Sequence, residues 1–189
     1  MNTIKNELDD INLEIIYDFF DEDYYSLAKE VCAEIGVQNV YDSTFGGKRC
    51  DLKNRFFITR NNSNKFLKLA DYINEKCNLD NNLMRLEICN DTDGFWLKQH
   101  NDHPERLYSY VIYVDGNGPG TTFVKDDKKI NIDWELNKAL YFKTNGFQTY
   151  EKSNLSHGVD KIKFFGIRST IIATFTDEKI WKNLNTCYI

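Results

Sequence analysis

The chain of 189 residues is poor in the residue types that mark low-complexity, disordered or fibrous proteins. It contains only two prolines and ten glycines, while 41% of its residues are hydrophobic and 14% are aromatic. This composition excludes a disordered chain and leaves enough apolar side chains for a packed core. The length predicts a single domain over residues 1–189.

Positive charge is also scarce, because the formal net charge is -5 and the pI is about 5.3. Proteins that wrap nucleic acid or coat an anionic membrane need a clear excess of Lys and Arg. No stretch approaches the roughly 18 consecutive apolar residues of a membrane span. The polar N-terminal segment lacks the basic head and apolar run of a signal peptide. We therefore expect neither a nucleic-acid partner nor a membrane partner.

The five cysteines are scattered through the chain and form no CxxC pair. An odd number at irregular spacing does not predict a disulfide framework. We expect reduced thiols and a cytoplasmic location, where disulfides are rare.

The first third of the chain has the periodicity of two strands and two helices. We predict strands over Leu13–Phe20 and within Arg55–Arg60, and helices over Asp23–Ile35 and Asn64–Cys77, with Asp21 as a helix cap. Each helix repeats apolar residues at a spacing of three or four, which predicts one buried face: Leu27, Val31 and Ile35 in the first, and Phe66, Leu69, Ile73 and Cys77 in the second.

From Leu83 onward, short apolar runs alternate with turn signals such as "NDTDG" and "DGNGPG". Seven runs of this kind predict an antiparallel sandwich or barrel. The runs are "LMRLEIC", "FWLKQHND", "LYSYVIYV", "TTFV", "KALYFK", "LSHGV" and "RSTIIATF". The fold class is therefore α+β and mainly β, with the N-terminal helices packed on one face of the sheet. We divide the chain into N-terminal elements (1–82), a β core (83–176) and a C-terminal tail (177–189).

Two of the three histidines lie in the segment "KQHNDHPER". In an extended chain, residues i and i+2 point to the same side, so His100 and Asp102 project together and His103 points away, toward the surface or a pocket rim. Together with His157, they would form the two-histidine, one-carboxylate triad of non-haem Fe(II) oxygenases. The alternatives are a polar pair beside a turn and a zinc hydrolase with the same ligands.

The strand "RSTIIATF" begins eleven residues after His157 and places Arg168 and Thr170 on one face. A guanidinium binds a carboxylate through two parallel hydrogen bonds, and a threonine hydroxyl adds one donor. A buried arginine needs an anion, and we expect a cosubstrate with a free carboxylate to supply it. A zinc hydrolase would not explain this pair.

The order His100, Asp102, His157, Arg168, Thr170 resembles that of the 2-oxoglutarate- and Fe(II)-dependent dioxygenases, in the bacterial branch related to prolyl hydroxylases. The resemblance covers about residues 83–176. It implies a double-stranded β-helix core, of the jelly-roll or cupin-like type. It implies that the two histidines and the aspartate hold Fe(II), and that the arginine and the threonine bind the C5 carboxylate of 2-oxoglutarate. Tyr113, on the strand after His-x-Asp, matches a tyrosine that reaches the same carboxylate.

The resemblance also implies the reaction. Oxidative decarboxylation of 2-oxoglutarate by O2 gives succinate and CO2 and is coupled to hydroxylation of a substrate, with ascorbate as a candidate stimulant. The carboxylate of Asp102 favours hydroxylation, since halogenating relatives lack it. Two alternatives stay open: a prolyl or peptidyl hydroxylase of the same chemistry, and a non-catalytic cupin-like metal-binding protein.

The substrate is the least constrained feature. Residues 46–68 carry seven basic side chains and one acidic one, which is either a solvated basic face or a substrate-binding segment. In the second case Arg49 or Arg55 would grip an anionic group of a small metabolite. Trp96 and Trp134 are candidates for the pocket wall, although lone tryptophans in strands usually belong to a core. The sequence does not predict the oligomeric state.

Overall fold

The computed structural model describes residues 2–4, 13–35, 55–58, 63–80, 82–102, 106–125, 128–143, 155–160, 163 and 166–177. These residues form two helices and eleven strands. The helices are α1 (Glu22–Ile35) and α2 (Asn64–Cys77). The strands are β1 (Asn2–Ile4), β2 (Leu13–Tyr17), β3 (Arg55–Ile58), β4 (Leu83–Thr92), β5 (Leu97–His100), β6 (Arg106–Asp115), β7 (Thr121–Lys125), β8 (Lys128–Ile132), β9 (Ala139–Lys143), β10 (Ser156–Val159) and β11 (Ile167–Thr176).

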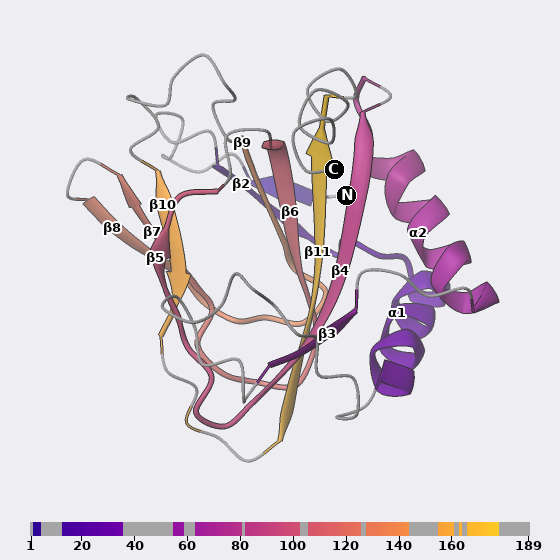
Figure 1. Ribbon diagram of the computed structural model, residues 1–189, viewed down its shortest axis with the longest axis horizontal. Coiled ribbons are helices and arrows are strands. Elements are labelled where there is room, and N and C mark those ends of the chain that lie inside the picture. Colours follow the sequence, from indigo (N-terminus) through magenta and orange to yellow (C-terminus); the bar gives the residue numbers. More distant parts are fainter. Residues whose placement is uncertain are drawn as a thin grey trace, which may run out of the picture.

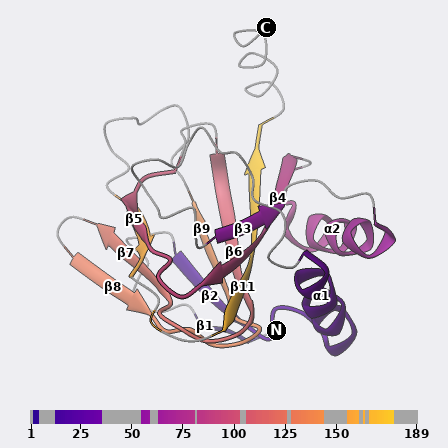
Figure 2. The same cartoon turned by 60° about the horizontal axis from the view of Figure 1, so that its bottom comes forward.

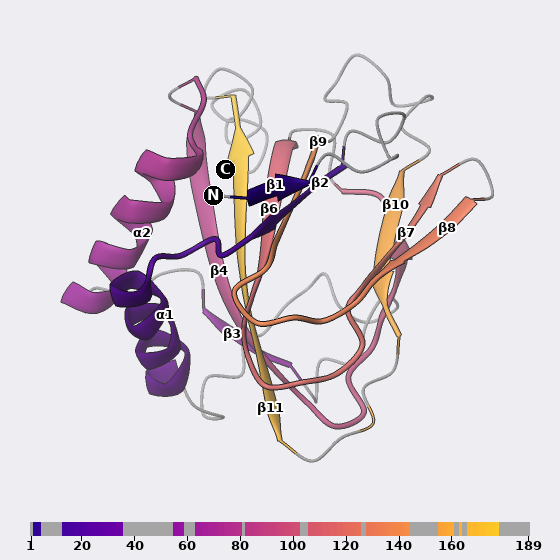
Figure 3. The same cartoon turned by 180° about the vertical axis from the view of Figure 1, so that it is seen from behind.

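The strands form two sheets in which every pairing is antiparallel. The larger sheet has the order β1-β2-β9-β6-β11-β4-β3, and the smaller has the order β5-β10-β7-β8. Figure 1 shows the two sheets as separate layers, with α1 and α2 on the outer face of the larger one. The view from behind places β1 and β2 along the same layer as β6 and β9 (Figure 3). This arrangement confirms the predicted α+β, mainly β, jelly-roll fold with helices on one face.

Strand alternation divides the larger sheet into two apolar faces. On β6 and β11, Ile112, Ile171 and Phe175 pack with the helices in one buried cluster. The residues between them face the smaller sheet, where Val111 and Tyr113 join a second cluster. Figure 2 shows the smaller sheet and the helices on opposite sides of the larger sheet. The interior between the sheets therefore receives every second residue of β4, β6 and β11.

Both helices begin at a capping side chain, of which Asp21 was predicted and Ser63 was not. The Asp21 carboxylate accepts a hydrogen bond from the backbone N–H of Tyr24 at 3.0 Å, and the Ser63 hydroxyl accepts one from the N–H of Phe66 at 3.2 Å. Such caps satisfy N–H groups that have no partner within the helix. In α2 the four predicted residues are all buried, which confirms its apolar face.

The buried face of α1 is rotated from the predicted one. Ala28, Val31 and Cys32 are 2% exposed or less, whereas Leu27 is only partly buried. The helix lies against β4 and β6 through its small residues, because these allow a close approach to the sheet. The side chain of Ile35 lies outside the described residues.

One predicted strand was too long, and two strands were missed. The strand β2 ends at Tyr17 and not at Phe20, because Asp18 adopts a φ of 51° and turns the chain. The strands β1 and β8 were not predicted. In β8 the sequence "KKINI" is polar because this strand lies at the edge of the smaller sheet, where lysines prevent further pairing.

No helix among the described residues has the length and apolar character needed to cross a membrane. The single domain, its three-part division and the cytoplasmic location stay predictions.

Candidate metal centre and anion pocket

His100, Asp102 and His157 converge between the two sheets. His100 on β5 and His157 on β10 are cross-strand partners, with ring centroids 4.4 Å apart. Nε2 of His157 lies 3.9 Å from Oδ1 of Asp102, and one ligand atom from each residue lies within 4.8 Å of the other two. Two ligands at right angles about 2.1 Å from one ion are about 3 Å apart. Small side-chain rotations would therefore bring all three onto one metal ion.

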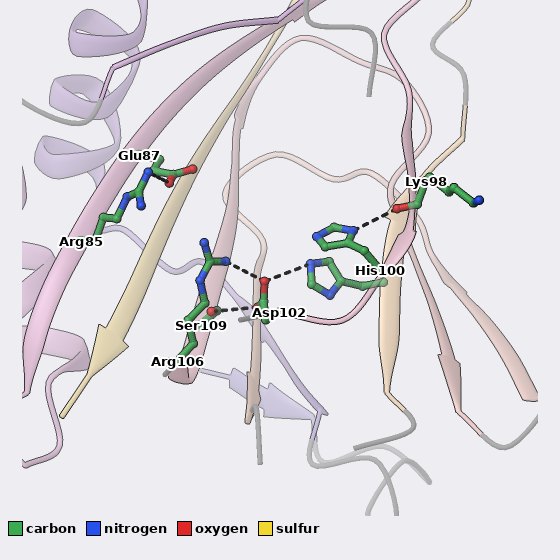
Figure 4. Close-up of polar contacts among 8 residues, drawn as sticks. Arg85, Glu87, Lys98, His100, Asp102, Arg106 and Ser109 are labelled. Carbon is green, nitrogen blue, oxygen red and sulfur yellow. Dashed lines mark hydrogen bonds and ion pairs between the residues drawn. The ribbon is translucent and has the colours of Figure 1, made fainter. Parts of the chain in front are cut away.

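The larger sheet holds the aspartate of this group. The strand β5 ends at His100, and Asp102 lies two residues beyond it. Arg106 on β6 donates a hydrogen bond from Nη1 to Oδ1 of Asp102 at 2.6 Å, and the Ser109 hydroxyl lies 3.4 Å from Oδ2. Figure 4 shows Arg106 and Ser109 directed at Asp102 from the same strand. The Asp102 carboxylate thus joins the end of the smaller sheet to the larger one.

The protonation states suit metal binding. Nδ1 of His100 lies 2.9 Å from the Lys98 carbonyl, which can only accept a hydrogen bond, so in the neutral imidazole Nε2 would carry the lone pair for a metal. Burial lowers the pKa of His157 to about 4, although the charge of Asp102 opposes this shift. Burial raises the pKa of Asp102, but the charges of His157 and Arg106 outweigh it and keep that pKa below its ordinary value. Two neutral imidazoles and one carboxylate are suitable ligands for Fe(II).

A second polar group lies on the inner face of the larger sheet. Arg168 and Thr170 on β11 are buried, and Thr170 is the cross-strand partner of Tyr113 on β6. Arg168 donates from Nη2 to Oδ2 of Asp91 at 2.8 Å and from Nη1 to the Pro119 carbonyl at 2.6 Å. The sequence argument that a cosubstrate must supply the anion for Arg168 is therefore wrong, because Asp91 supplies it.

Two hydrogen-bond donors in this group have no protein partner. The buried Nε of Arg168 and Oγ1 of Thr170 make no hydrogen bond, although both belong to the same face of β11. A buried donor without a partner costs about 1–3 kcal/mol. A carboxylate within hydrogen-bond reach would supply an acceptor that these donors lack, so the donor types fit a ligand with a terminal carboxylate.

Aromatic rings pack around this second polar group, which we call the anion pocket: Arg168, Thr170, Tyr113 and Trp134. The Trp134 ring stacks on Tyr113 at a centroid distance of 4.3 Å, and the Arg168 guanidinium lies 4.9 Å from the Trp134 centroid. The Tyr113 hydroxyl donates to Oγ1 of Thr121 at 2.8 Å and accepts from the Thr121 N–H at 2.9 Å. Burial raises the pKa of Tyr113 to about 12, so the hydroxyl stays protonated. Its contact with a bound carboxylate stays a prediction, since its proton is engaged by Thr121.

The strand β7 connects the two groups. Phe123 is the cross-strand partner of His157, and their ring centroids lie 6.0 Å apart. Thr121, two residues earlier and on the same face, contacts Tyr113 in the pocket. Two residues of a strand span about 7 Å. One strand therefore contacts His157 of the first group and Tyr113 of the second.

The structure describes only part of the residues that were predicted to bind the substrate or to lie at the pocket rim. Arg49 and His103 lie outside the described residues, and Arg55 is described only as part of the backbone of β3. Trp96 precedes β5 with 36% of its surface exposed.

The sequence analysis did not single out Asp91, Arg106 or Ser109. A signal existed for Arg106, which follows Asp102 by four residues. Asp91 was hidden within the turn signal "NDTDG", and only the pairing of β4 with β11 places it beside Arg168.

Known structures share this fold. A prolyl hydroxylase from Trichoplax adhaerens, in complex with a hypoxia inducible factor oxygen degradation domain peptide fragment, aligns over 92% of this chain and 87% of its own, with a TM-score of 0.67 and 16% identity. A Pseudomonas putida prolyl-4-hydroxylase aligns over 91% and 96%, with a TM-score of 0.62 and 12% identity. HygX from Streptomyces hygroscopicus, with nickel and 2-oxoglutarate bound, aligns over 90% and 85%, with a TM-score of 0.64 and 10% identity.

These structural neighbours confirm the fold that the sequence resemblance indicated. No protein-family model and no curated protein sequence matches the chain. At 10–16% identity the likeness is one of fold, and the chemistry must be argued from the residues of this chain.

Proposed function

We propose that the chain is a non-haem Fe(II) oxygenase that couples the oxidative decarboxylation of 2-oxoglutarate to the hydroxylation of a substrate. One observation carries the proposal. Two histidines and an aspartate converge within 4.8 Å, in the same interior as the partnerless donors Arg168 Nε and Thr170 Oγ1. A metal-binding protein without catalytic activity would need the first group but not the second.

The residues divide the task between them. His100, Asp102 and His157 would hold Fe(II), while Arg168 and Thr170 would bind the distal carboxylate of 2-oxoglutarate. When bound, the metal and the cosubstrate supply the activation of O2 and release succinate and CO2. Only three protein ligands would hold the metal, which would leave it accessible to the cosubstrate. The side chains of Asp102 and His157 are only 3% and 12% exposed, which limits the access of water.

We propose a small anionic metabolite as the substrate. Arg85 on β4 is 49% exposed and pairs with Glu87 at 2.8 Å. Alternation places both on the inner face of the sheet, opposite Leu86 and Ile88, which pack with the helices. Figure 4 shows this pair in the same region as Arg106 and Asp102. Arg85 can bind an anionic group of a substrate that enters toward the metal centre.

A peptidyl or prolyl hydroxylase is the second candidate. Two of the structural neighbours are prolyl hydroxylases, one of them in complex with a peptide fragment.

Succinate formation tests the proposed function. Protein loaded with Fe(II) is supplied with 2-oxoglutarate, O2 and ascorbate, and succinate is measured with panels of small anionic metabolites and of proline-containing peptides. We expect one panel to raise the rate of succinate release above the substrate-free rate and to yield a product that is heavier by one oxygen atom. Protein with His157→Ala is the control and should form no succinate. Absence of succinate with and without every panel member would favour the non-catalytic cupin-like protein.

A further inference from the structure

The buried ion pair between Asp91 and Arg168 sets the charge of the anion pocket. The two residues are cross-strand partners on β4 and β11, and their side chains are 0% and 3% exposed. The rings of Trp134 and Phe95 lie 4.9 Å and 5.9 Å from the guanidinium carbon. In apolar surroundings of this kind, a carboxylate 2.8 Å from a guanidinium largely cancels its charge.

A ligand in the pocket therefore meets hydrogen-bond donors but little net positive charge. The Pro119 carbonyl accepts from Nη1 of Arg168, and the Asp91 carboxylate accepts from Nη2. Arg168 Nε and Thr170 Oγ1 are the donors in this group that lack a partner. A ligand carboxylate bound to Nε would share the guanidinium with Asp91, at a separation of roughly 6 Å. At an effective dielectric constant of about 20, repulsion at that separation weakens binding on the order of ten- to hundredfold.

We propose that Asp91 is a specificity-determining residue of the cosubstrate pocket. It reduces the affinity that a distal carboxylate adds to a ligand. Five-carbon 2-oxo acids with and without this carboxylate therefore bind with similar affinity. The inference rests on the proposed function, because it concerns the ligand that Arg168 and Thr170 receive. It adds a prediction that the function alone does not make, namely a weak preference for the dicarboxylate.

The test compares 2-oxoglutarate with 2-oxopentanoate, which has the same chain length but no distal carboxylate. Both are titrated by calorimetry into protein loaded with Mn(II), so that affinity is measured without turnover. In the unmodified protein we expect the Kd of 2-oxoglutarate to be lower than that of 2-oxopentanoate by less than about tenfold. In Asp91→Asn the preference should rise by about tenfold or more, because the amide oxygen still accepts from Arg168 but carries no charge.

Glu87→Gln is the matched control. Glu87 lies on the same face of β4 and loses the same charge, but its ion-pair partner is Arg85 rather than Arg168. The Glu87→Gln protein should show the same ratio of affinities for the two acids as the unmodified protein. If Asp91→Asn does not fold, the test is the ratio of the affinities of the two acids for the unmodified protein. A ratio above about a hundredfold would contradict the neutralisation of Arg168 by Asp91.

The double variant Asp91→Asn with Arg168→Gln provides a further arm that leaves no buried charge. It should bind the two acids equally, and a retained preference would show that other residues recognise the distal carboxylate. An unchanged preference in Asp91→Asn, with both acids still bound, overturns the inference and leaves the proposed function intact. Failure of both acids to bind Mn(II)-loaded protein overturns the proposed function itself.

Discussion

At the scale of single residues, the proposed metal centre depends most on the position of Asp102. It lies beyond the end of β5, and its carboxylate is held by Arg106 and Ser109 of the larger sheet. The ligand set is therefore supported by both layers of the fold. Partners of this kind orient metal ligands, and their loss typically costs about 10–100-fold in metal affinity.

We predict that Arg106→Ala weakens Mn(II) binding by about 10–100-fold, because the Asp102 carboxylate loses its 2.6 Å contact. Arg106→Lys keeps a positive donor and should recover part of the affinity. Calorimetric titration with Mn(II) measures both variants. Equal affinity in Arg106→Ala and the unmodified protein would show that Asp102 needs no support from β6.

Mutations in the two residue groups should affect different properties, namely iron binding and 2-oxoglutarate binding. We expect His100→Ala and His157→Ala to abolish iron binding. We expect Arg168→Ala and Thr170→Val to raise the 2-oxoglutarate concentration needed for half-maximal binding while the iron content stays the same. Iron is measured by metal analysis after anaerobic reconstitution and gel filtration, and 2-oxoglutarate binding by titration. Equal loss of iron in all four variants would contradict this division.

At the scale of elements, the turn "DGNGPG" packs against the anion pocket. The carbonyl of Pro119 accepts from Arg168, and the carbonyl of Gly116 accepts from Nε1 of Trp134 at 3.1 Å. Gly116 has a φ of 85°, and a Cβ there would collide with the Ile167 carbonyl oxygen. The turn is therefore a structural requirement of the pocket as well as a connection between β6 and β7.

We predict that Gly116→Ala lowers the free energy of unfolding by more than about 2 kcal/mol, since it combines strain at positive φ with a backbone collision. It should also weaken 2-oxoglutarate binding through Trp134. The exposed Lys128→Ala on β8 is the control, with an expected change within about 0.5 kcal/mol. Denaturant unfolding followed by fluorescence measures both variants. Equal stability of the two would contradict the close approach at Gly116.

Elements with local signals were predictable from the sequence, and those that depend on distant pairing were not. The helix α2 has a regular apolar stripe, so its limits and its buried face were predicted together. The strand β8 carries only two apolar residues, Ile130 and Ile132, because an edge strand of the smaller sheet needs few buried residues. The convergence of His100, Asp102 and His157 could be predicted because His100 and Asp102 are two residues apart and their order with His157 resembles that of a known family. Asp91 could not, because its role follows from the register of β4 against β11.

At the scale of the whole molecule, the proposed ligands bind between the two sheets. The smaller sheet provides His100 and His157, whereas the larger sheet provides Arg168 and Thr170. Ligands that bind only the folded state stabilise it in proportion to the logarithm of their concentration over Kd. The metal and the cosubstrate together should therefore stabilise the layers against separation.

We predict that Mn(II) raises the Tm, that adding 2-oxoglutarate raises it further, and that EDTA reverses both shifts. His157→Ala should show neither shift, while its Tm without ligands stays close to that of the unmodified protein without ligands. Differential scanning calorimetry measures these changes. A shift with 2-oxoglutarate that is equally large in the presence of EDTA would place its binding away from the metal.

The most direct test of the central claim is the absorption spectrum of the anaerobic protein after addition of Fe(II) and then 2-oxoglutarate. The account predicts a weak visible charge-transfer band that requires both additions and is absent in His157→Ala. A spectrum without this band in the unmodified protein, even though Fe(II) is bound in equimolar amount, would contradict the account.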